Sequence, residues 1–136
     1  MDLAAINYLA VAAAAVIGFV VGAVWYAPFA FGGLWMNLNP VTLEDLRPRG
    51  HLGALTVALA GSLLQALVLA IMLHATGARG LGPALWLAAF LWLGFTAAPS
   101  FVDAQFERRP FAGWLITAGH RLAEALAMGA VLGLWL

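Results

Sequence analysis

The chain alternates long uncharged stretches with short polar ones. Four stretches are long and apolar enough to cross a hydrocarbon core of about 30 Å as helices. They cover about residues 3–26, 52–75, 84–102 and 112–135. Lipid offers the backbone no hydrogen-bond partners, so such stretches are stable there as helices. We therefore predict an all-α integral membrane protein, with one transmembrane domain over residues 1–136 and four helices in an up-down bundle.

The connection after the first stretch is the longest in the chain. Residues 29–36 are too apolar for a solvated loop and too short to span, so they predict an interfacial or re-entrant segment. Trp25 and Tyr26 before it are typical of a membrane interface, and Pro28 discourages the helix from continuing. Further along, Thr42 is expected to cap a short polar helix.

Small residues recur at every fourth position in three of the helices, which lets a neighbouring helix approach closely. The stripes are Ala14, Gly18 and Gly22 in the first helix, Ala54, Ala58 and Ser62 in the second, and Ala125, Gly129 and Gly133 in the last. We predict that the first helix packs against the last and the second against the third. A disulfide between Gly18→Cys and Gly129→Cys would test the first pairing. Such stripes also serve self-association, and both uses stay open.

Isolated polar residues stand inside the first three helices. Asn7 lies on the packing face of the first, and Gln65 is an amide near the middle of the second that needs a partner across helices. In the third, Pro99 lacks the N–H that would bond the carbonyl of Phe95, so a kink is expected there. Around this proline, one polar face carries Thr96, Ser100, Asp103 and Glu107.

The last helix contains three ionisable residues in an otherwise apolar sequence. Glu124 lies one helical turn from both His120 and Arg121, so the three share a face. A charged side chain at the centre of a membrane helix costs roughly 2.5–3.5 kcal/mol to insert, so it is expected to face a partner. With the C-terminus held at an interface, Glu124 lies roughly 18 Å deep, whereas Arg121 can reach the opposite head-groups. Asp103 is the fourth candidate member of this polar cluster.

Two interpretations of the polar cluster stay open. A buried ion pair, extended by Asp103 or Glu107, would fix helix register. A proton relay or a site for a small polar or anionic molecule would give the same residues a function. A metal bound by His120 and Glu124 with His74 is a weaker hypothesis, because two ligands are too few and His74 lies toward the other surface.

Composition agrees with a membrane protein and excludes other classes. Hydrophobic residues make up 65% of the chain and charged residues 9%, against about 45–50% and 25% in soluble domains. The formal net charge is zero, so no surface for nucleic acid is expected. The absence of cysteine excludes disulfides and thiolate metal sites. No HExxH, GxSxG, P-loop or dinucleotide motif occurs, so no catalytic residue, metal site or cofactor is assigned and an enzyme is not expected.

The aromatic residues are interpreted as interface and packing residues, with a pigment, quinone or lipid groove as the alternative. Arginine positions predict orientation: residues 27–51 and 103–111 carry Arg47, Arg49, Arg108 and Arg109, and the opposite side carries only Arg79. By the positive-inside rule both of these loops face the cytoplasm and both termini face outward. The Ala-, Gly- and Arg-rich, lysine-free composition is typical of a GC-rich bacterial genome. We therefore expect a multi-pass protein of the bacterial inner (cytoplasmic) membrane.

Several short motifs resemble one protein family. They are Trp25-Tyr26-Ala27-Pro28, Phe31-Gly32, Trp35-Met36 and Thr42-Leu43-Glu44-Asp45-Leu46, followed by Phe106-Glu107-Arg108-Arg109-Pro110, Trp114-Leu115-Ile116 and Ala118-Gly119. Together they resemble an uncharacterised bacterial membrane family, domain of unknown function 1761. The resemblance covers most of the chain and implies a four-helix membrane protein without an established activity. Members of that family tend to have an aromatic–His pair where this chain has His120-Arg121.

Two functions follow as expectations. The first is a small accessory or scaffold subunit that acts through helix packing, with the lipid bilayer and other membrane subunits or itself as partners. Four helices enclose too little volume for a roomy transport path in one monomer, so a larger or homo-oligomeric assembly is expected. The second is a small transporter, channel or proton relay that uses the polar cluster. Lipid-facing stripes favour the first function, and a water-accessible Glu124 favours the second.

Overall fold

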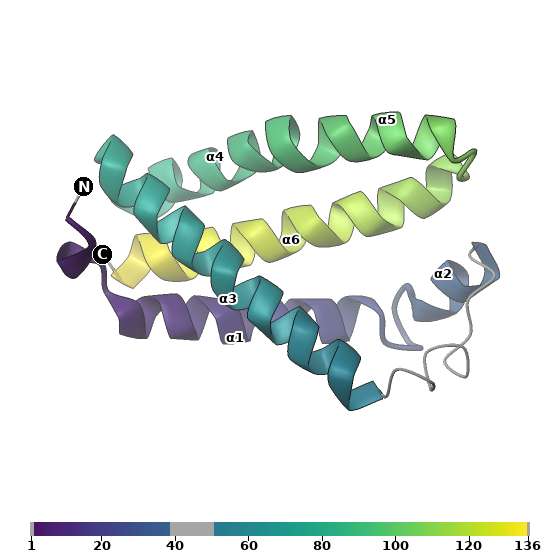
Figure 1. Ribbon diagram of the computed structural model, residues 1–136, viewed down its shortest axis with the longest axis horizontal. Coiled ribbons are helices and arrows are strands. Elements are labelled where there is room, and N and C mark those ends of the chain that lie inside the picture. Colours follow the sequence, from purple (N-terminus) through teal and green to yellow (C-terminus); the bar gives the residue numbers. More distant parts are fainter. Residues whose placement is uncertain (1, 39–50, 136) are drawn as a thin grey trace.

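The computed structural model describes residues 2–38 and 51–135 of the chain (Figure 1). These residues contain helices and no strand, which confirms the all-α class. Four helices are long and apolar enough to cross a membrane: Tyr8–Trp25, Leu52–Thr76, Leu81–Phe106 and Phe111–Trp135. The short helix expected after Thr42, together with Arg47 and Arg49, lies outside the described residues.

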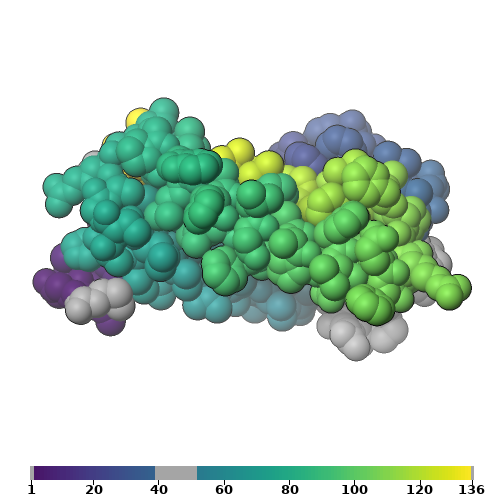
Figure 2. Space-filling model, turned by 90° about the horizontal axis from the view of Figure 1, so that it is seen from above, coloured from purple at the N-terminus to yellow at the C-terminus, as the bar shows by residue number. Residues whose placement is uncertain are grey.

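The described residues form several helical elements. In chain order they are the 3-10 turn η1 (Leu3–Ala5), α1 (Tyr8–Trp25), α2 (Gly32–Leu38), α3 (His51–Thr76), α4 (Leu81–Trp92), the π-helical η3 (Leu93–Ala97), α5 (Ala98–Phe106) and α6 (Phe111–Trp135). The α4–η3–α5 segment is one continuous rod, and it runs the length of the face seen in Figure 2. The rod is therefore a single long helix with a π-helical turn in its middle.

The start of α1 differs from the prediction. The sequence places Asn7 on the packing face of a helix that begins near Leu3. In the structure its side chain instead accepts a hydrogen bond from the N–H of Ala10 at 3.1 Å and caps the helix. An N-cap residue lies outside the helical conformation, so α1 begins at Tyr8, the residue after Asn7.

The disturbance predicted near Phe95 takes the form of the π-helical turn η3. Pro99 cannot donate a hydrogen bond to the carbonyl one turn earlier, and its ring would crowd that turn. A π-helical turn is wider and uses longer-range bonds, so it accommodates the proline without breaking the rod.

Both chain termini lie at one end of the bundle, together with the α3–α4 turn (Figure 1). That turn uses Gly77 and Gly80, whose φ angles of 68° and 88° fall in the region that glycine adopts without penalty. The α5–α6 hairpin and α2 lie at the other end. The predicted segment, residues 29–36, overlaps α2, which packs beside α6 with Leu38 close to Gly113.

The helices pack side by side in the order α3, α1, α6, α4. The predicted pairing of the first long helix with the last is confirmed, because α1 and α6 share one of the largest interfaces. The predicted pairing of the second with the third is wrong. α3 crosses α1 obliquely and contacts α4 only sparsely (Figure 1). The physical reason is that α1 is alanine-rich on two sides, so it admits α3 on one side and α6 on the other.

The stripe on α1 receives large side chains of α6. A Cβ added at Gly22 would lie 2.9 Å from Nε2 of His120, and one added at Gly18 would overlap the side chain of Met128. Ala14, the third member of the stripe, is fully buried in the same interface region. The small residues of α1 therefore make room for large side chains of α6.

The stripe on α6 faces a different helix. A Cβ added at Gly129 would lie 3.1 Å from Cβ of Ala88, and one added at Gly133 would lie 2.6 Å from Cβ of Ala84. Both alanines belong to α4. The glycines at 18 and 129 thus point to different neighbours, and the disulfide that the sequence suggests between these positions is not expected.

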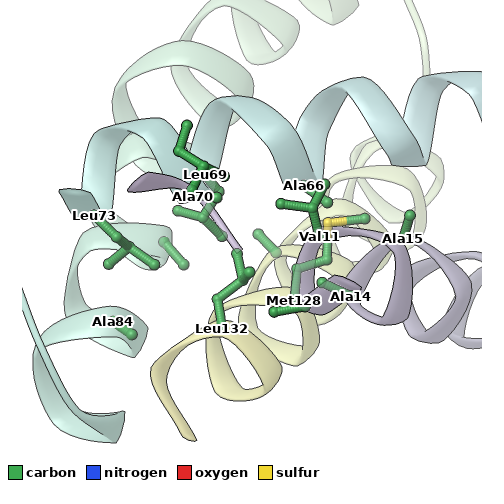
Figure 3. Packing of buried hydrophobic residues seen from close by; sticks show 14 residues of the cluster. Val11, Ala14, Ala15, Ala66, Leu69, Ala70, Leu73, Ala84, Met128 and Leu132 are labelled. Atoms are coloured by element: carbon green, nitrogen blue, oxygen red, sulfur yellow. The ribbon is translucent and has the colours of Figure 1, made fainter. Parts of the chain in front are cut away.

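The apolar core lies between α1, α3 and α6 toward the end where the termini lie. In Figure 3, Met128 and Leu132 of α6 point into the space between α1 and α3. Both side chains are completely buried, and they contact alanines such as Ala14 and Ala66 in the same cluster. In lipid, dense packing of this kind stabilises a helix bundle by van der Waals contact.

Candidate functional site

Glu124 is the centre of the polar cluster. It lies in the middle of α6, and only 2% of its surface is exposed. Its Oε1 accepts a hydrogen bond from Oγ of Ser62 on α3, at 2.8 Å. Its Oε2 accepts one from Nη1 of Arg121, also at 2.8 Å. A buried carboxylate is costly unless it is paired and hydrogen-bonded, and here both oxygens have a partner.

The partner from α3 is a residue whose role the sequence analysis missed. Ser62 is predicted there only as a small residue in a packing stripe. A hydroxyl near the middle of an apolar helix needs a hydrogen-bond acceptor in lipid, and this feature of the sequence could have indicated the role of Ser62. The glycine at position 18 brings α1 close to the same carboxylate, since a Cβ there would lie 3.2 Å from Cγ of Glu124.

His120 lies beside the carboxylate without bonding to it. Its Nε2 is 3.8 Å from Oε2 of Glu124, beyond hydrogen-bond distance. This nitrogen is buried and has no hydrogen-bond partner among the described residues. The imidazole packs edge-on to Tyr26, with ring centroids 5.0 Å apart, and near Trp25, at 6.3 Å. These two rings hold the imidazole in place. It can lie close to the backbone of α1 because Gly22 has no side chain.

Two tryptophans tie α6 to its neighbours close to the polar cluster. The indole N–H of Trp25 on α1 donates to the carbonyl of Ile116 at 3.0 Å. The indole N–H of Trp92 on α4 donates to the carbonyl of Ala118 at 2.9 Å. Trp25, predicted as an interface residue, therefore has a bonding partner inside the bundle. Both bonds end on the turn that precedes His120, so they fix the position of the polar cluster.

Arg121 has a different environment from its partner. Half of its side-chain surface is exposed, against 3% for Glu124. It lies on the floor of a groove of about 620 Å³ between α3 and α4. One wall is formed by α3 residues that include Gly61 and Gln65, and the other by α4 and η3 residues that include Trp92 and Thr96. We call this space the α3–α4 groove. The groove exists because α3 packs against α1 and makes few contacts with α4.

A comparison with sequence families matches residues 9–133 to DUF1761, described as a protein of unknown function. The chain belongs to this family. No curated protein and no solved structure matches it. The match includes all residues of the polar cluster and the α3–α4 groove in this DUF1761 protein, and it assigns them no activity.

The structure does not bring every candidate residue of the DUF1761 protein to Glu124. Asp103 is exposed on α5 and makes no side-chain bond within the described residues. Glu107 pairs instead with Arg109 in the hairpin. His74 is exposed near the end of α3, away from His120, so the three-residue metal hypothesis has no geometric support. Polarity along a helix face did not reveal that its residues have different surroundings: Ser100 accepts a hydrogen bond from Trp114 of α6, whereas Asp103 is exposed.

In the DUF1761 protein, Gln65 lies on the wall of the α3–α4 groove and not in a contact between two helices. The sequence predicts a partner across helices. In the structure the amide is half-buried and forms no side-chain hydrogen bond with the described residues. The groove therefore contains polar groups whose hydrogen-bonding capacity is not used inside the bundle.

Proposed function

We propose that this DUF1761 protein is a small interaction subunit, and that its α3–α4 groove receives a transmembrane helix of a partner protein. The position of α3 supports this most directly. It packs on α1 and diverges from α4, so the bundle is open where a closed four-helix bundle has a helix–helix contact. A helix in this groove would contact α3, α4 and α6 at once.

The lining of the groove suits helix packing in lipid. Gly61 is an exposed small residue on the α3 wall, and small residues permit the close approach that stabilises membrane helix pairs. Ala88 and Ala125 also line the groove but are already buried in the bundle. A Cβ added at Gly61 would have no atom within 4 Å, so no neighbour among the described residues requires glycine there. Glycine inside a helix costs roughly 1 kcal/mol relative to alanine. Close approach by an external helix would offset that cost.

Depth favours a helix over a lipid head-group as the occupant. Arg121 lies about 15 Å along α6 from Phe111, at 1.5 Å per residue. With Phe111 at the membrane surface this is half of a hydrocarbon core of about 30 Å, and with Trp135 at the opposite surface Arg121 lies about 9 Å inside the core, so in both cases the groove opens within the hydrocarbon region. Phosphate head-groups lie at the surface, whereas a spanning helix presents side chains at every depth.

Transport has less support. A channel or proton relay needs an ionisable group that meets water or exchanges its proton. The Glu124 side chain is almost fully enclosed, and Ser62 and Arg121 occupy its two oxygens. For orientation, we propose that the α5–α6 hairpin faces the cytoplasm of a bacterial cell, because it carries Arg108 and Arg109.

Site-specific photocrosslinking in host membranes tests the proposed function. The photoreactive residue p-benzoylphenylalanine replaces Gly61 in the groove or, as control, Gly94 on η3. Both glycines are exposed, and a Cβ added at either would meet no atom within 4 Å. We expect a discrete protein adduct at 61, identified by mass spectrometry as a spanning segment of another protein, and none at 94. Adducts only with lipid, only with a second copy of this chain, or equally at both positions would refute the proposed function.

A further inference from the structure

We propose that the partner helix carries an Asp or Glu at the depth of Arg121, and that its carboxylate binds Arg121. This inference rests on the proposed function and adds the chemistry by which the α3–α4 groove selects its partner. It starts from the unused hydrogen-bonding capacity of two side chains in the polar cluster.

The first of these is Arg121. A guanidinium has five N–H donors in a planar fork, which matches a carboxylate in a two-point contact. In the structure one of them, on Nη1, donates to Glu124, and the side chain is half-exposed into the groove. Donors left without acceptors in apolar surroundings carry a desolvation cost. An acceptor that enters the groove at this depth would remove it.

The second is His120. Its buried Nε2 has no partner among the described residues and is 3.8 Å from Oε2 of Glu124, the oxygen that Arg121 now occupies. A carboxylate in the groove would attract the guanidinium toward itself. A small rotation of the imidazole would then let Nε2–H replace Nη1–H at Oε2. One added carboxylate thus satisfies both side chains.

The charges of the polar cluster set a condition on a carboxylate in the groove. Arg121 and Glu124 already form a neutral pair, and His120 carries charge only when it is protonated. Among the described residues, Asp103 is exposed and Glu107 pairs with Arg109, so neither belongs to the polar cluster. A second carboxylate therefore brings one negative charge, and uptake of one proton by His120 would give two acids and two bases that pair inside the membrane.

Model peptides test this without knowledge of the natural partner. The full chain is purified, labelled with a donor dye at Gly53→Cys, and reconstituted in phosphatidylcholine–phosphatidylglycerol vesicles. Gly53 is exposed and open, lies outside the groove, and would be the only cysteine. Acceptor-labelled Leu–Ala transmembrane peptides carry Glu, Gln or Leu at their centre. Energy transfer should show the Glu peptide binding about tenfold more tightly than the Leu peptide, with Gln much closer to Leu.

Two variants locate the effect. Arg121→Gln with Glu124→Gln removes both charges together, so no unpaired charge is left buried. It should abolish the preference for Glu, so that the Glu and Leu peptides bind this variant with similar affinity. Gly61→Phe adds a ring at a position where a Cβ would meet no atom within 4 Å, and should weaken binding of all three peptides. A disulfide between Ala88→Cys and Gly129→Cys, introduced into an unlabelled copy of each variant, reports that the bundle is intact.

The outcomes separate this inference from the proposed function. Equal binding of the three peptides, or a Glu preference that survives in the double variant, would overturn the carboxylate contact. Neither result affects a protein adduct at position 61. Absence of that adduct in host membranes would instead refute the proposed partner helix, whatever the model peptides do.

Discussion

The hydrogen bond from Ser62 to Glu124 gives the sharpest test of the polar cluster. Both residues are almost completely buried, and the Oγ–Oε1 distance is 2.8 Å. Ser62→Ala removes the donor and leaves a buried carboxylate oxygen without it. Hydrogen bonds to charged groups contribute about 1.5–3 kcal/mol in soluble proteins, whereas those measured between membrane helices average about 0.6 and reach about 1.7 kcal/mol. Because the acceptor is charged, we expect a loss near the upper membrane value, about 1.5 kcal/mol.

The assay is reversible unfolding in mixed micelles by titration with dodecyl sulfate, followed by tryptophan fluorescence. Thr56→Val is the matched control, since Thr56 is an exposed hydroxyl on the same helix that donates to the carbonyl of Leu52. It should change the free energy of unfolding by less than about 0.5 kcal/mol.

Repeating Ser62→Ala in a Glu124→Gln background separates a charged acceptor from mere packing. Charge-assisted hydrogen bonds are roughly twice as strong as neutral ones, so the loss should fall to about half. An equal loss in both backgrounds would mean that the serine matters for its size. A loss no greater than that of the Thr56 control would contradict the bond itself.

Two further predictions concern the glycines. Gly22→Ala places a Cβ 2.9 Å from the imidazole behind it, so it should destabilise the bundle by about 1–3 kcal/mol, whereas Gly94→Ala, which meets open space, should be neutral or slightly stabilising in the same titration. Copper–phenanthroline oxidation in membranes should form a disulfide between Ala88→Cys and Gly129→Cys and none between Gly18→Cys and Gly129→Cys; the opposite result would show that α6 is rotated from its position here.

The sequence predicted those features that depend on neighbouring residues of one helix. His120, Arg121 and Glu124 form a cluster because helical geometry places them on one face, whatever surrounds that helix. The four long helices likewise follow from the length and apolarity of each stretch alone. The pairing of α1 with α6 was also correct, although the reason was not, since the two stripes meet different neighbours.

Features that depend on which faces meet were not predictable from the pattern. In lipid both the exterior and the interior of a bundle are apolar, so hydrophobicity does not mark the inward face. For this reason Ser62 was taken for a packing residue, and Asp103 was grouped with a carboxylate it does not approach. A small residue is ambiguous in the same way, because it accommodates either another backbone or a large side chain such as Met128.

The π-helical turn η3 has a consequence for the phase of the third long helix. Trp92 and Ser100 both bond to α6, the first to the carbonyl of Ala118 and the second as acceptor from the indole of Trp114. They are separated by eight positions, and at about 100° per residue a regular α-helix would leave them about 80° apart around the axis. A π-helical turn contains about one extra residue, which changes this angle by about 100° in the opposite direction. Trp92 and Ser100 therefore lie on the same side of the rod. The number of residues in Leu93–Ala97 thus sets the angular alignment of the two halves of this rod, independently of which side chains they carry.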